Sequence, residues 1–460
     1  MMGVSSKTQT KYYTMETLKN PSNVGTIERF NLWLNGSVTV RIFSITILVL
    51  LLMIPNSMIR DIIRERQNTS NDAIIEVSDK WGFEQTVVGP VISVPYLTYK
   101  EDSEGKRTYS KYWSHFLPDQ LTIDADVTSE NRKRGIYEVV VYSSDMTLSG
   151  KFKKPDPATV NLTAENFLLD QAILSMGIPD MRGINEKVSV SFNDTVAEFG
   201  PGIPTTDVFE EGISVRMPIG EEEVYDFKIK LDLKGSQLLK FVPIGKETEV
   251  NLTSDWPHPS FDGAFLPDNY DVRKDGFNAS WKVLDLNRNF PQSWIGTRVG
   301  LYDSAFGFKL FMPNDHYQQS MRSAKYAILF ISLTFMVFFF METINKKRIH
   351  PIQYILVGLA LSIFFVLLLS LSEFVGFNVA YMVGAAATTL LITIYSSHIL
   401  SSRKLTAFLF GLLAVMYGFI FTILQLEDTA LLVGSIGLFI ILSTIMIWSR
   451  KVDWYGGVSK

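Results

Sequence analysis

The chain has 460 residues, of which 47% are hydrophobic and 20% are charged, and its formal net charge at pH 7 is −4. Such a weak negative charge argues against nucleic acid as a partner. The sequence contains no cysteine, which excludes disulfides, thiolate catalysis and metal centres with cysteine ligands. Secreted eukaryotic domains of this size usually carry disulfides, so the composition favours a bacterial envelope protein.

The first 41 residues precede an apolar run at residues 42–59, which is just long enough to span a bilayer. The 41 preceding residues are too many for an ordinary signal peptide, and no small-residue cleavage site follows the apolar run. We therefore expect a cytoplasmic N-terminal extension (1–41) and an uncleaved signal anchor (42–59).

Five more apolar stretches follow near the C-terminus, each of about 20 residues, which is the length needed to cross ~30 Å of hydrocarbon at ~1.5 Å per residue. They are residues 326–345, 352–371, 375–395, 405–425 and 430–448. The sequence predicts an α-helical polytopic membrane protein with six transmembrane helices, in which the anchor precedes a five-helix C-terminal bundle and a cytoplasmic tail (449–460).

Basic residues concentrate in alternate segments, which predicts the orientation in the membrane. They are Lys7, Lys11, Lys19, Arg29 and Arg41 before the anchor, Lys346, Lys347 and Arg348 after the second span, Arg403 and Lys404 after the fourth, and Arg450 and Lys451 after the last. The other loops carry only acids, Glu373 in one and Glu427 with Asp428 in the other. The positive-inside rule then places both termini in the cytoplasm and residues 60–325 in the periplasm. Arg60, Arg64 and Arg66 disagree with this rule, although Asp61 and Glu65 partly offset them.

Residues 60–325 have no long apolar run and instead alternate polar residues with Val, Ile, Tyr and Phe. Gly, Pro and Asp separate these stretches, as β-strands in a sandwich or barrel require. We expect a large inserted periplasmic β-rich domain, sandwich-like, with a short helical piece at residues 165–177. The expected strands include residues 86–99, 135–150, 187–192, 224–233, 248–254 and 306–312.

Two segments of this domain resemble each other. WSHFLPD (113–119) is echoed by WPHPSFDGAFLPD (256–268), and each precedes a basic stretch that ends in Gly, RKRG (132–135) and RKDG (273–276). The match indicates either a duplication, with β modules near residues 84–180 and 210–315, or a coincidence in a strand-rich sequence.

The residues that could carry chemistry favour structural roles. His115, His258 and His316 could form a metal site, but their spacing matches no local ligand pattern. Glu342 and Glu373 lie close to the ends of their spans, and Glu342 precedes Lys346 by four residues, a favourable helix pairing. No G-x-S-x-G, P-loop, H-E-x-x-H or dinucleotide fingerprint occurs in the sequence. We therefore expect no enzyme, no catalytic residue, no metal and no cofactor.

Several strings resemble the inner membrane protein CreD family, whose members are also described as cell envelope integrity proteins. The strings include VVGPVISVP (87–95), MRGI (181–184), LTSDWPHPSFDGAFLP (252–267), KYAILFISLTFMVFFFMETI (325–344), IHPIQYILVGLALSIFFVLLLSLSEFVGF (349–377) and a closing DWY (453–455). The resemblance covers roughly residues 40–455 and implies a protein of the bacterial cytoplasmic membrane that is linked to envelope integrity and stress. The family has no established catalytic residues to carry over.

The leading hypothesis is a non-enzymatic membrane protein that binds a periplasmic or envelope protein, or another envelope component, through its periplasmic domain, with the lipid bilayer as its other partner. The alternatives are a small-molecule transporter that uses the helix bundle and an enzyme that acts on lipid or cell wall at the membrane face. A path lined by Tyr354, Ser362, Asn378, Thr388 and Thr389 would favour the transporter if these residues converge.

The segment most specific to the family is expected to act through its shape. Pro257 and Pro259 each fix φ near −65°, so the segment is stiff, and large apolar rings flank it. We expect the Trp256 ring to be buried and the His258 side chain to make a hydrogen bond that orients the turn. The family-motif residues with this structural role are Trp256, Pro257, His258, Pro259, Phe261, Phe265, Leu266 and Pro267.

Overall fold

The computed structural model describes residues 38–101, 103–296, 300–310, 316–345, 349–426 and 429–450. The chain divides into two compact units: the helical unit, Met1–Ile63 with His316–Lys460, and the β unit, Arg64–Asp315. The basic loop at 346–348, the acids at 427–428, the residues before 38 and the tail after 450 lie outside the described residues.

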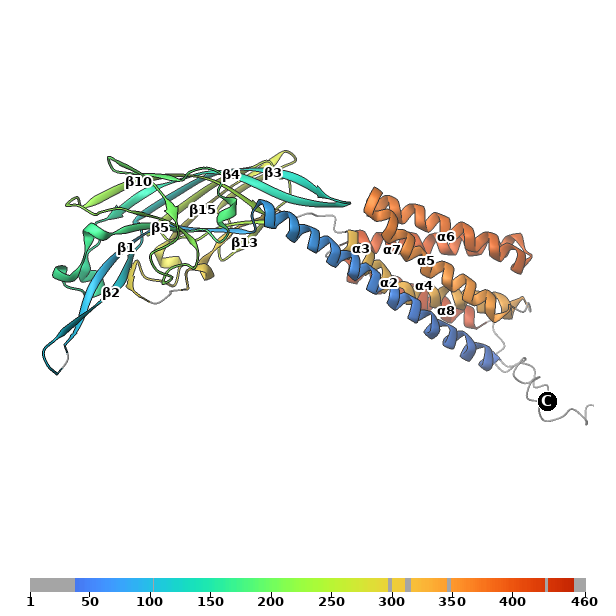
Figure 1. Cartoon of the computed structure of the whole chain (residues 1–460). Helices are drawn as coiled ribbons and strands as arrows, with labels where there is room; N and C mark the ends of the chain where they lie inside the picture. Colours follow the sequence, from blue (N-terminus) through green and yellow to red (C-terminus); the bar gives the residue numbers. More distant parts are fainter. Residues whose placement is uncertain are drawn as a thin grey trace, which may run out of the picture. The chain divides into compact units, whose positions relative to one another are not determined.

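The β unit is built from two sheets (Figure 1). In the first sheet the strand order is β13–β17–β11–β1–β5–β9–β8, with β2 paired to β1 and β16 paired to β2. The bounds of its strands are β1 Gln85–Glu101, β2 Arg107–Phe116, β5 Ile173–Gly177, β8 Gly200–Pro201, β9 Gly212–Arg216, β11 Leu238–Phe241, β13 Pro259–Gly263, β16 Ser293–Ile295 and β17 Phe306–Leu310.

In the second sheet the order is β14–β15–β12–β3–β4–β10–β6–β7. The bounds of its strands are β3 Gln120–Arg134, β4 Tyr137–Lys153, β6 Ser189–Phe192, β7 Thr195–Glu198, β10 Val224–Ser236, β12 Glu247–Ser254, β14 Asn269–Arg273 and β15 Gly276–Leu284. The prediction of a large β-rich region between the first and second spans is confirmed.

One core lies between the two sheets because the strands bury every second side chain. In β10, Tyr225, Phe227 and Ile229 are buried while the residues between them are exposed. Aromatic rings meet across the core, with ring centroids of Phe277 and Phe308 5.0 Å apart. Each large side chain buried in this way stabilises the fold by roughly 1.5–3 kcal/mol.

The six expected strands correspond to β1, β4, β6, β10, β12 and β17. The prediction of a helical piece at residues 165–177 is wrong. This stretch forms two short 3-10 turns, Ala164–Asn166 and Leu169–Gln171, and then β5. Pairing of β5 with both β1 and β9 in the buried centre of the first sheet overrides the local helical preference.

The two FLPD segments lead into equivalent hairpins of the second sheet. The first precedes β3 and β4, which turn at Gly135, and the second precedes β14 and β15, which turn just before Gly276. The two expected modules nevertheless do not fold separately, because β1 pairs in parallel with β11 and β3 pairs in parallel with β12. A duplication would therefore have produced two halves that share both sheets and one core.

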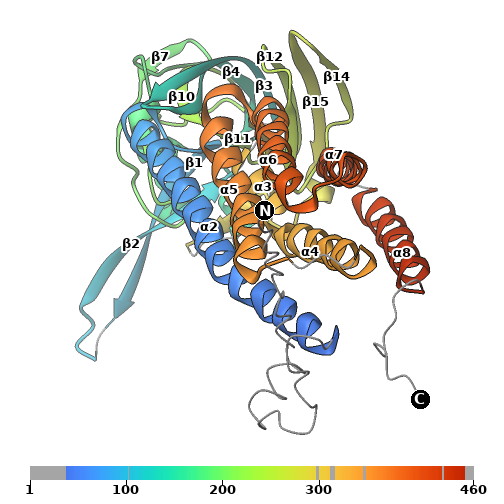
Figure 2. The same cartoon turned by 90° about the vertical axis from the view of Figure 1, so that its right-hand side faces the viewer.

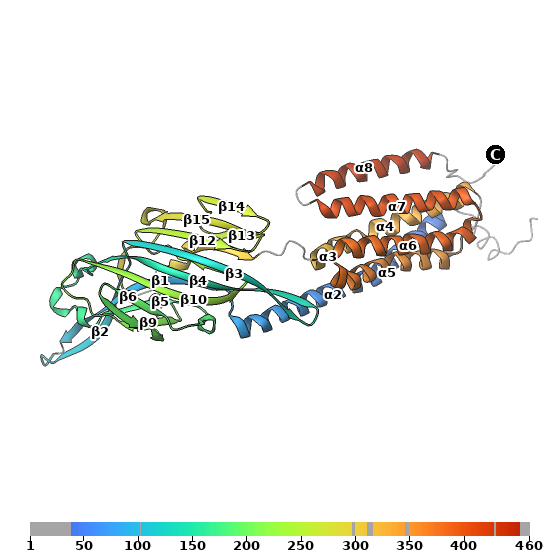
Figure 3. The same ribbon diagram turned by 90° about the horizontal axis from the view of Figure 1, so that it is seen from above.

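Six helical stretches of the described chain are long and apolar enough to cross a membrane, which confirms the predicted number of spans. In Figure 3, α8 lies beside α7 at the margin of the helical unit, and Figure 2 shows the same order from another side. The helices are α2 Val38–Trp81, α3 His316–Lys325 followed by α4 Ala327–Ile344, α5 Pro351–Val375, α6 Phe377–Leu400, α7 Arg403–Gln425 and α8 Ala430–Ser449.

The first helix differs from the expected anchor because it does not end at residue 59. α2 is continuous for 44 residues, through Pro55 and on to Trp81. After Pro55 no Gly or Pro interrupts the sequence until Gly82, whose φ of +142° lies in a region that side chains disfavour. The helix therefore continues through the charged residues after 59 and enters the β unit.

Candidate functional site

The family-motif segment forms a turn between β12 and β13 of the β unit. The Trp256 indole N–H donates to the backbone carbonyl of His258 at 3.0 Å, and the Trp256 backbone N–H donates to Ser254 Oγ at 3.2 Å. Trp256 is half-buried and His258 is exposed. The bond that orients the turn thus comes from the Trp256 ring, and the His258 backbone accepts it in place of the expected bond from the imidazole.

The rings that follow this turn attach it to the core. Phe261 lies 5.8 Å from Phe277 and 5.9 Å from Trp281, measured between ring centroids, and both partners belong to β15 of the second sheet. Phe265 packs edge-on against Phe306 of β17 at 5.8 Å. Aromatic pairs of this kind add about 0.5–1.5 kcal/mol beyond the area that they bury. The segment therefore fastens the two sheets together at one end of the sandwich.

This same end of the sandwich is open. β13 is the last strand of the first sheet and β14 is the last strand of the second. β14 is exposed along its whole length. Its apolar residues Tyr270 and Val272, together with Leu266 before it, are 65%, 43% and 75% exposed. We call these three residues and strand β14 the β14 edge.

An ion-pair cluster beside this edge escaped the sequence analysis. Asp262 of β13 lies 2.6 Å from Lys240 Nζ and 3.8 Å from Lys309 Nζ. The hydrogen bond from Lys240 is the largest of the effects that hold the pKa of Asp262 below its ordinary value. The three residues belong to β13, β11 and β17, which lie side by side only after the sheet forms. No local pattern in the sequence could have joined them.

His115 occupies a buried polar position in β2. Its Nδ1 lies 2.9 Å from Ser93 Oγ, the cross-strand neighbour in β1, and its Nε2 lies 3.5 Å from Asp207 Oδ2. Burial lowers the pKa of His115 to about 4 even though Asp207 favours the charged form. Serine, histidine and aspartate resemble a hydrolytic triad in composition. Ser93 and His115 are both buried, however, so a substrate has no access to the hydroxyl.

The three histidines considered for a metal site are in unrelated settings. His115 is buried in β2, His258 is exposed before β13, and His316 starts α3 in the helical unit. Among the described residues, no group of three or more histidine and acidic side chains could hold a metal ion.

Glu342 is a buried acid in the helical unit and contacts two other helices. Its Oε2 accepts a hydrogen bond from the Tyr354 hydroxyl of α5 at 3.1 Å, and its Oε1 lies 3.4 Å from Arg41 Nη1 of α2. The expected partner Lys346 lies outside the described residues. Glu373, near the other end of α5, accepts a bond from the Tyr317 hydroxyl at 3.1 Å. Both acids thus link separate helices of the unit.

Comparison with known proteins gives one consistent result. Residues 37–455 match the family described as inner membrane protein CreD. Inner membrane protein CreD of Escherichia coli (strain K12) is 36% identical over 421 residues, which cover 88% of this chain and 91% of that protein. The chain belongs to the CreD family of inner membrane proteins. The family name gives a location and no reaction, and it assigns no role to the residues described above.

The polar residues that would line a transport path in this CreD family member have separate surroundings. Tyr354 bonds to Glu342, and the Gln425 side chain donates to Asn378 at the opposite end of the bundle. Ser362 donates to the Gly358 carbonyl within its own helix. Thr388 and Thr389 are buried in the middle of α6. Tyr354, Ser362 and Asn378 thus each bond to a different partner, and no hydrogen bond described here joins two of the five residues.

Proposed function

We propose that this CreD family member is a non-enzymatic membrane protein that supports the integrity of the bacterial envelope. Its β unit lies in the periplasm and binds a protein or another envelope component, while both chain termini lie in the cytoplasm. The distribution of Lys and Arg among the loops supports this orientation, because basic loops are retained on the cytoplasmic side.

The observation that carries the proposal is the β14 edge. The last strand of a sheet presents unpaired backbone N–H and C=O groups, to which an extended segment of another protein can add as a further strand. Here the strand also exposes Tyr270 and Val272 on the side of Phe261, whose ring centroid lies 5.4 Å from that of Tyr270. An added strand would cover these apolar side chains and close the end of the sandwich.

The geometry gives less support to an enzyme. The group that most resembles catalytic machinery, Ser93 with His115, is sealed in the core. Among the described residues that form the β14 edge, the titratable side chains that pair are Asp271 and Arg273. The edge instead presents exposed apolar side chains and backbone groups. These are features of a binding surface.

The proposal is tested by complementation of a deletion strain challenged with an envelope-active agent. Leu266→Ser combined with Tyr270→Ser should abolish complementation. The protein level in the membrane should stay normal, since exposed substitutions usually change stability by less than about 0.5 kcal/mol.

The matched control is Val196→Ser, because Val196 is 72% exposed and lies in β7, the strand at the opposite end of the same sheet. This variant should complement fully. If the β14 edge variant complements as well as the Val196 variant does, the β14 edge is not the binding surface.

A further inference from the structure

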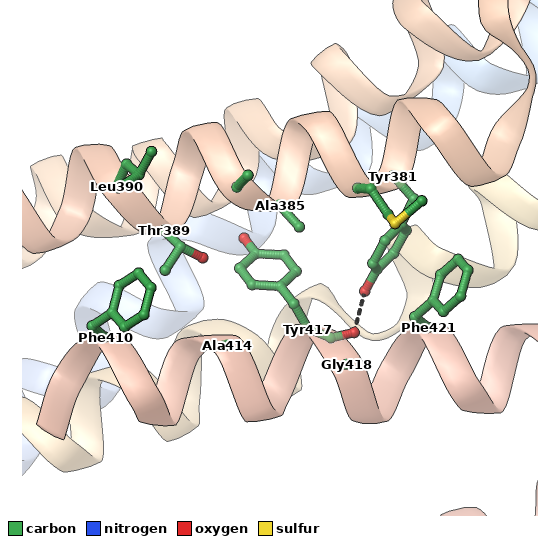
Figure 4. A pocket seen from close by; sticks show the side chains of 11 residues that line it. Tyr381, Ala385, Thr389, Leu390, Phe410, Ala414, Tyr417, Gly418 and Phe421 are labelled. Carbon is green, nitrogen blue, oxygen red and sulfur yellow. Dashed lines mark hydrogen bonds between the residues drawn. The ribbon is translucent and has the colours of Figure 1, made fainter. Parts of the chain in front are cut away.

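A groove lies between α6 and α7 on the surface of the helical unit, far along the chain from the β14 edge. It holds about 500 Å³ of free volume, within the range of ~300–1,000 Å³ that is usual for ligand pockets. Figure 4 shows aromatic rings on both helices around it and small side chains between them. The lining residues are Tyr381, Met382, Ala385, Ala386, Thr389, Leu390, Phe410, Ala414, Tyr417, Gly418 and Phe421.

Small residues create this groove. A Cβ added at Gly418 would meet no heavy atom within 4 Å, so the space beside α7 is empty at this point. Ala414 lies one turn earlier on α7, and Ala385 and Ala386 line the groove from α6. Their small side chains also leave space between the two helices. The floor is fixed by Tyr381, whose hydroxyl donates to the Tyr417 backbone carbonyl at 2.9 Å (Figure 4). This bond links α6 to α7 at the floor of the groove.

The groove opens on the apolar surface of membrane-spanning helices. Met382 and Leu390 on its rim are 59% and 52% exposed, and the neighbouring Val415 is 70% exposed. Side chains of this kind on a spanning helix face hydrocarbon chains, so lipid is the molecule that reaches the groove at high concentration. Because lipid chains are as apolar as leucine, retention of a chain here depends on close packing against the rings.

The length of the groove fits one leaflet. From Tyr381 to Leu390 the helix rises about 14 Å, and from Phe410 to Phe421 about 16 Å, at ~1.5 Å per residue. Half of a ~30 Å hydrocarbon core is ~15 Å. The groove therefore accommodates a chain that descends from one surface of the membrane to its middle.

Polar groups mark the end from which such a chain would enter. Beyond Tyr381 and Phe421, towards the start of α6 and the end of α7, the exposed side chains of Gln425 and Asn378 are hydrogen-bonded to each other. Arg322 of α3 donates to the Leu426 carbonyl at the same end of α7, at 3.2 Å. Amide and guanidinium groups at this level suit the ester and phosphate oxygens of a lipid.

We propose that the groove between α6 and α7 binds one acyl chain of a membrane phospholipid, with the lipid's polar head beside Asn378, Gln425 and Arg322. The site goes beyond the function proposed for the β unit and does not depend on it. In the orientation proposed above, the lipid belongs to the periplasmic leaflet.

The test uses the full chain reconstituted into vesicles of phosphatidylethanolamine and phosphatidylglycerol that contain a small fraction of phospholipid with a diazirine on its acyl chain. After irradiation, the adducts are mapped by mass spectrometry of peptides. Adducts should concentrate on groove residues such as Met382 and Leu390, and exceed those on the neighbours Leu391 and Val415, which are at least as exposed. An even spread over all exposed helix faces would overturn the proposal, because it would indicate ordinary bilayer lipid.

A matched pair of glycine substitutions provides the second measurement. Gly418→Leu places a side chain in the groove and should reduce the groove adducts at least about fivefold, since the chain then has no room. Gly411→Leu adds the same side chain to the same helix, where space is also open but outside the groove lining, and should leave them unchanged. Equal adduct yields in the two variants, or crosslinks from the groove to a second copy of the protein, would overturn the proposal.

Discussion

His115 connects the stability of the β unit to pH. The buried imidazole has a pKa of about 4, whereas an exposed histidine has a pKa of 6.5. Between these values the unfolded chain binds a proton that the folded chain does not bind, so stability is present above pH 6.5 and is lost as the pH falls towards 4. We expect the free energy of unfolding to fall by up to about 3 kcal/mol across this window.

The measurement is unfolding of the purified full chain followed by tryptophan fluorescence, because the Trp294 ring lies 5.4 Å from that of His115. Carboxylates also titrate in part of this range, so variants must separate their effect. His115→Gln should flatten the pH dependence, whereas His258→Gln should keep it, since His258 is exposed. The same slope in His115→Gln and in the unmodified chain would contradict the prediction.

At the residue scale, sequence reasoning predicted a turn at the family motif but assigned its orienting hydrogen bond to the wrong group. The W-P-H-P-S-F pattern predicted a stiff turn with flanking rings, because proline and aromatic residues act locally. The sequence did not reveal that the Trp256 ring stays half-buried and that the His258 carbonyl accepts its hydrogen bond. The contact of Phe265 with Phe306 of β17 and the pairing of Asp262 with Lys240 of β11 join residues that are distant in the chain, so no local pattern predicts them.

At the scale of elements, the C-terminal end of α2 is attached to the strands of the β unit by several polar contacts. The Trp81 indole donates to the Tyr142 carbonyl at 3.0 Å, and Arg182 bridges Asp79 of the helix, at 2.6 Å, to Asp180, at 2.9 Å. Arg182→Ala should lower the free energy of unfolding of the β unit, because Asp180 is largely buried and loses its cationic partner.

This loss is measured by unfolding the full chain in denaturant and following the β-sheet signal in the far-UV circular dichroism spectrum. Arg273→Ala is the control, because Arg273 pairs with Asp271 on an exposed strand, so its loss should lower the free energy of unfolding clearly less than the loss of Arg182 does. Equal effects of the two substitutions would mean that Arg182 does not secure the helix.

Helices and strands with a strong hydrophobic pattern were predicted correctly, whereas those with a weak pattern were missed. A run of about 20 apolar residues is typical of a transmembrane helix, so the spans could be predicted from the sequence. Alternating strands such as β10 and β12 were also evident, because one face of each is buried. The polar extension of α2 after residue 59 and the short strand β5 carry weak patterns. Their states depend on contacts with the β sheets that no local window contains.

At the scale of the whole molecule, the number of units followed from composition but the strand order did not. The β unit mixes early and late strands in both sheets, with β1 beside β11 and β3 beside β12. These parallel pairs join segments more than a hundred residues apart, and such pairings have no local sequence signal. The orientation, in contrast, is predicted from the number of basic residues in each loop, and that prediction does not require knowledge of the fold.

The orientation itself is testable with single cysteines, because the chain contains none to remove. Lys100→Cys and Gly220→Cys lie at exposed positions of the β unit, and Arg403→Cys lies at the exposed start of α7. In intact spheroplasts an impermeant thiol reagent should label the first two positions. It should label position 403 only after permeabilisation, because the proposed orientation, based on the basic loops, places this end of α7 in the cytoplasm. Labelling at 403 before permeabilisation, with positions 100 and 220 silent, would reverse the orientation. The β14 edge would then face the cytoplasm, and a periplasmic binding partner would be ruled out.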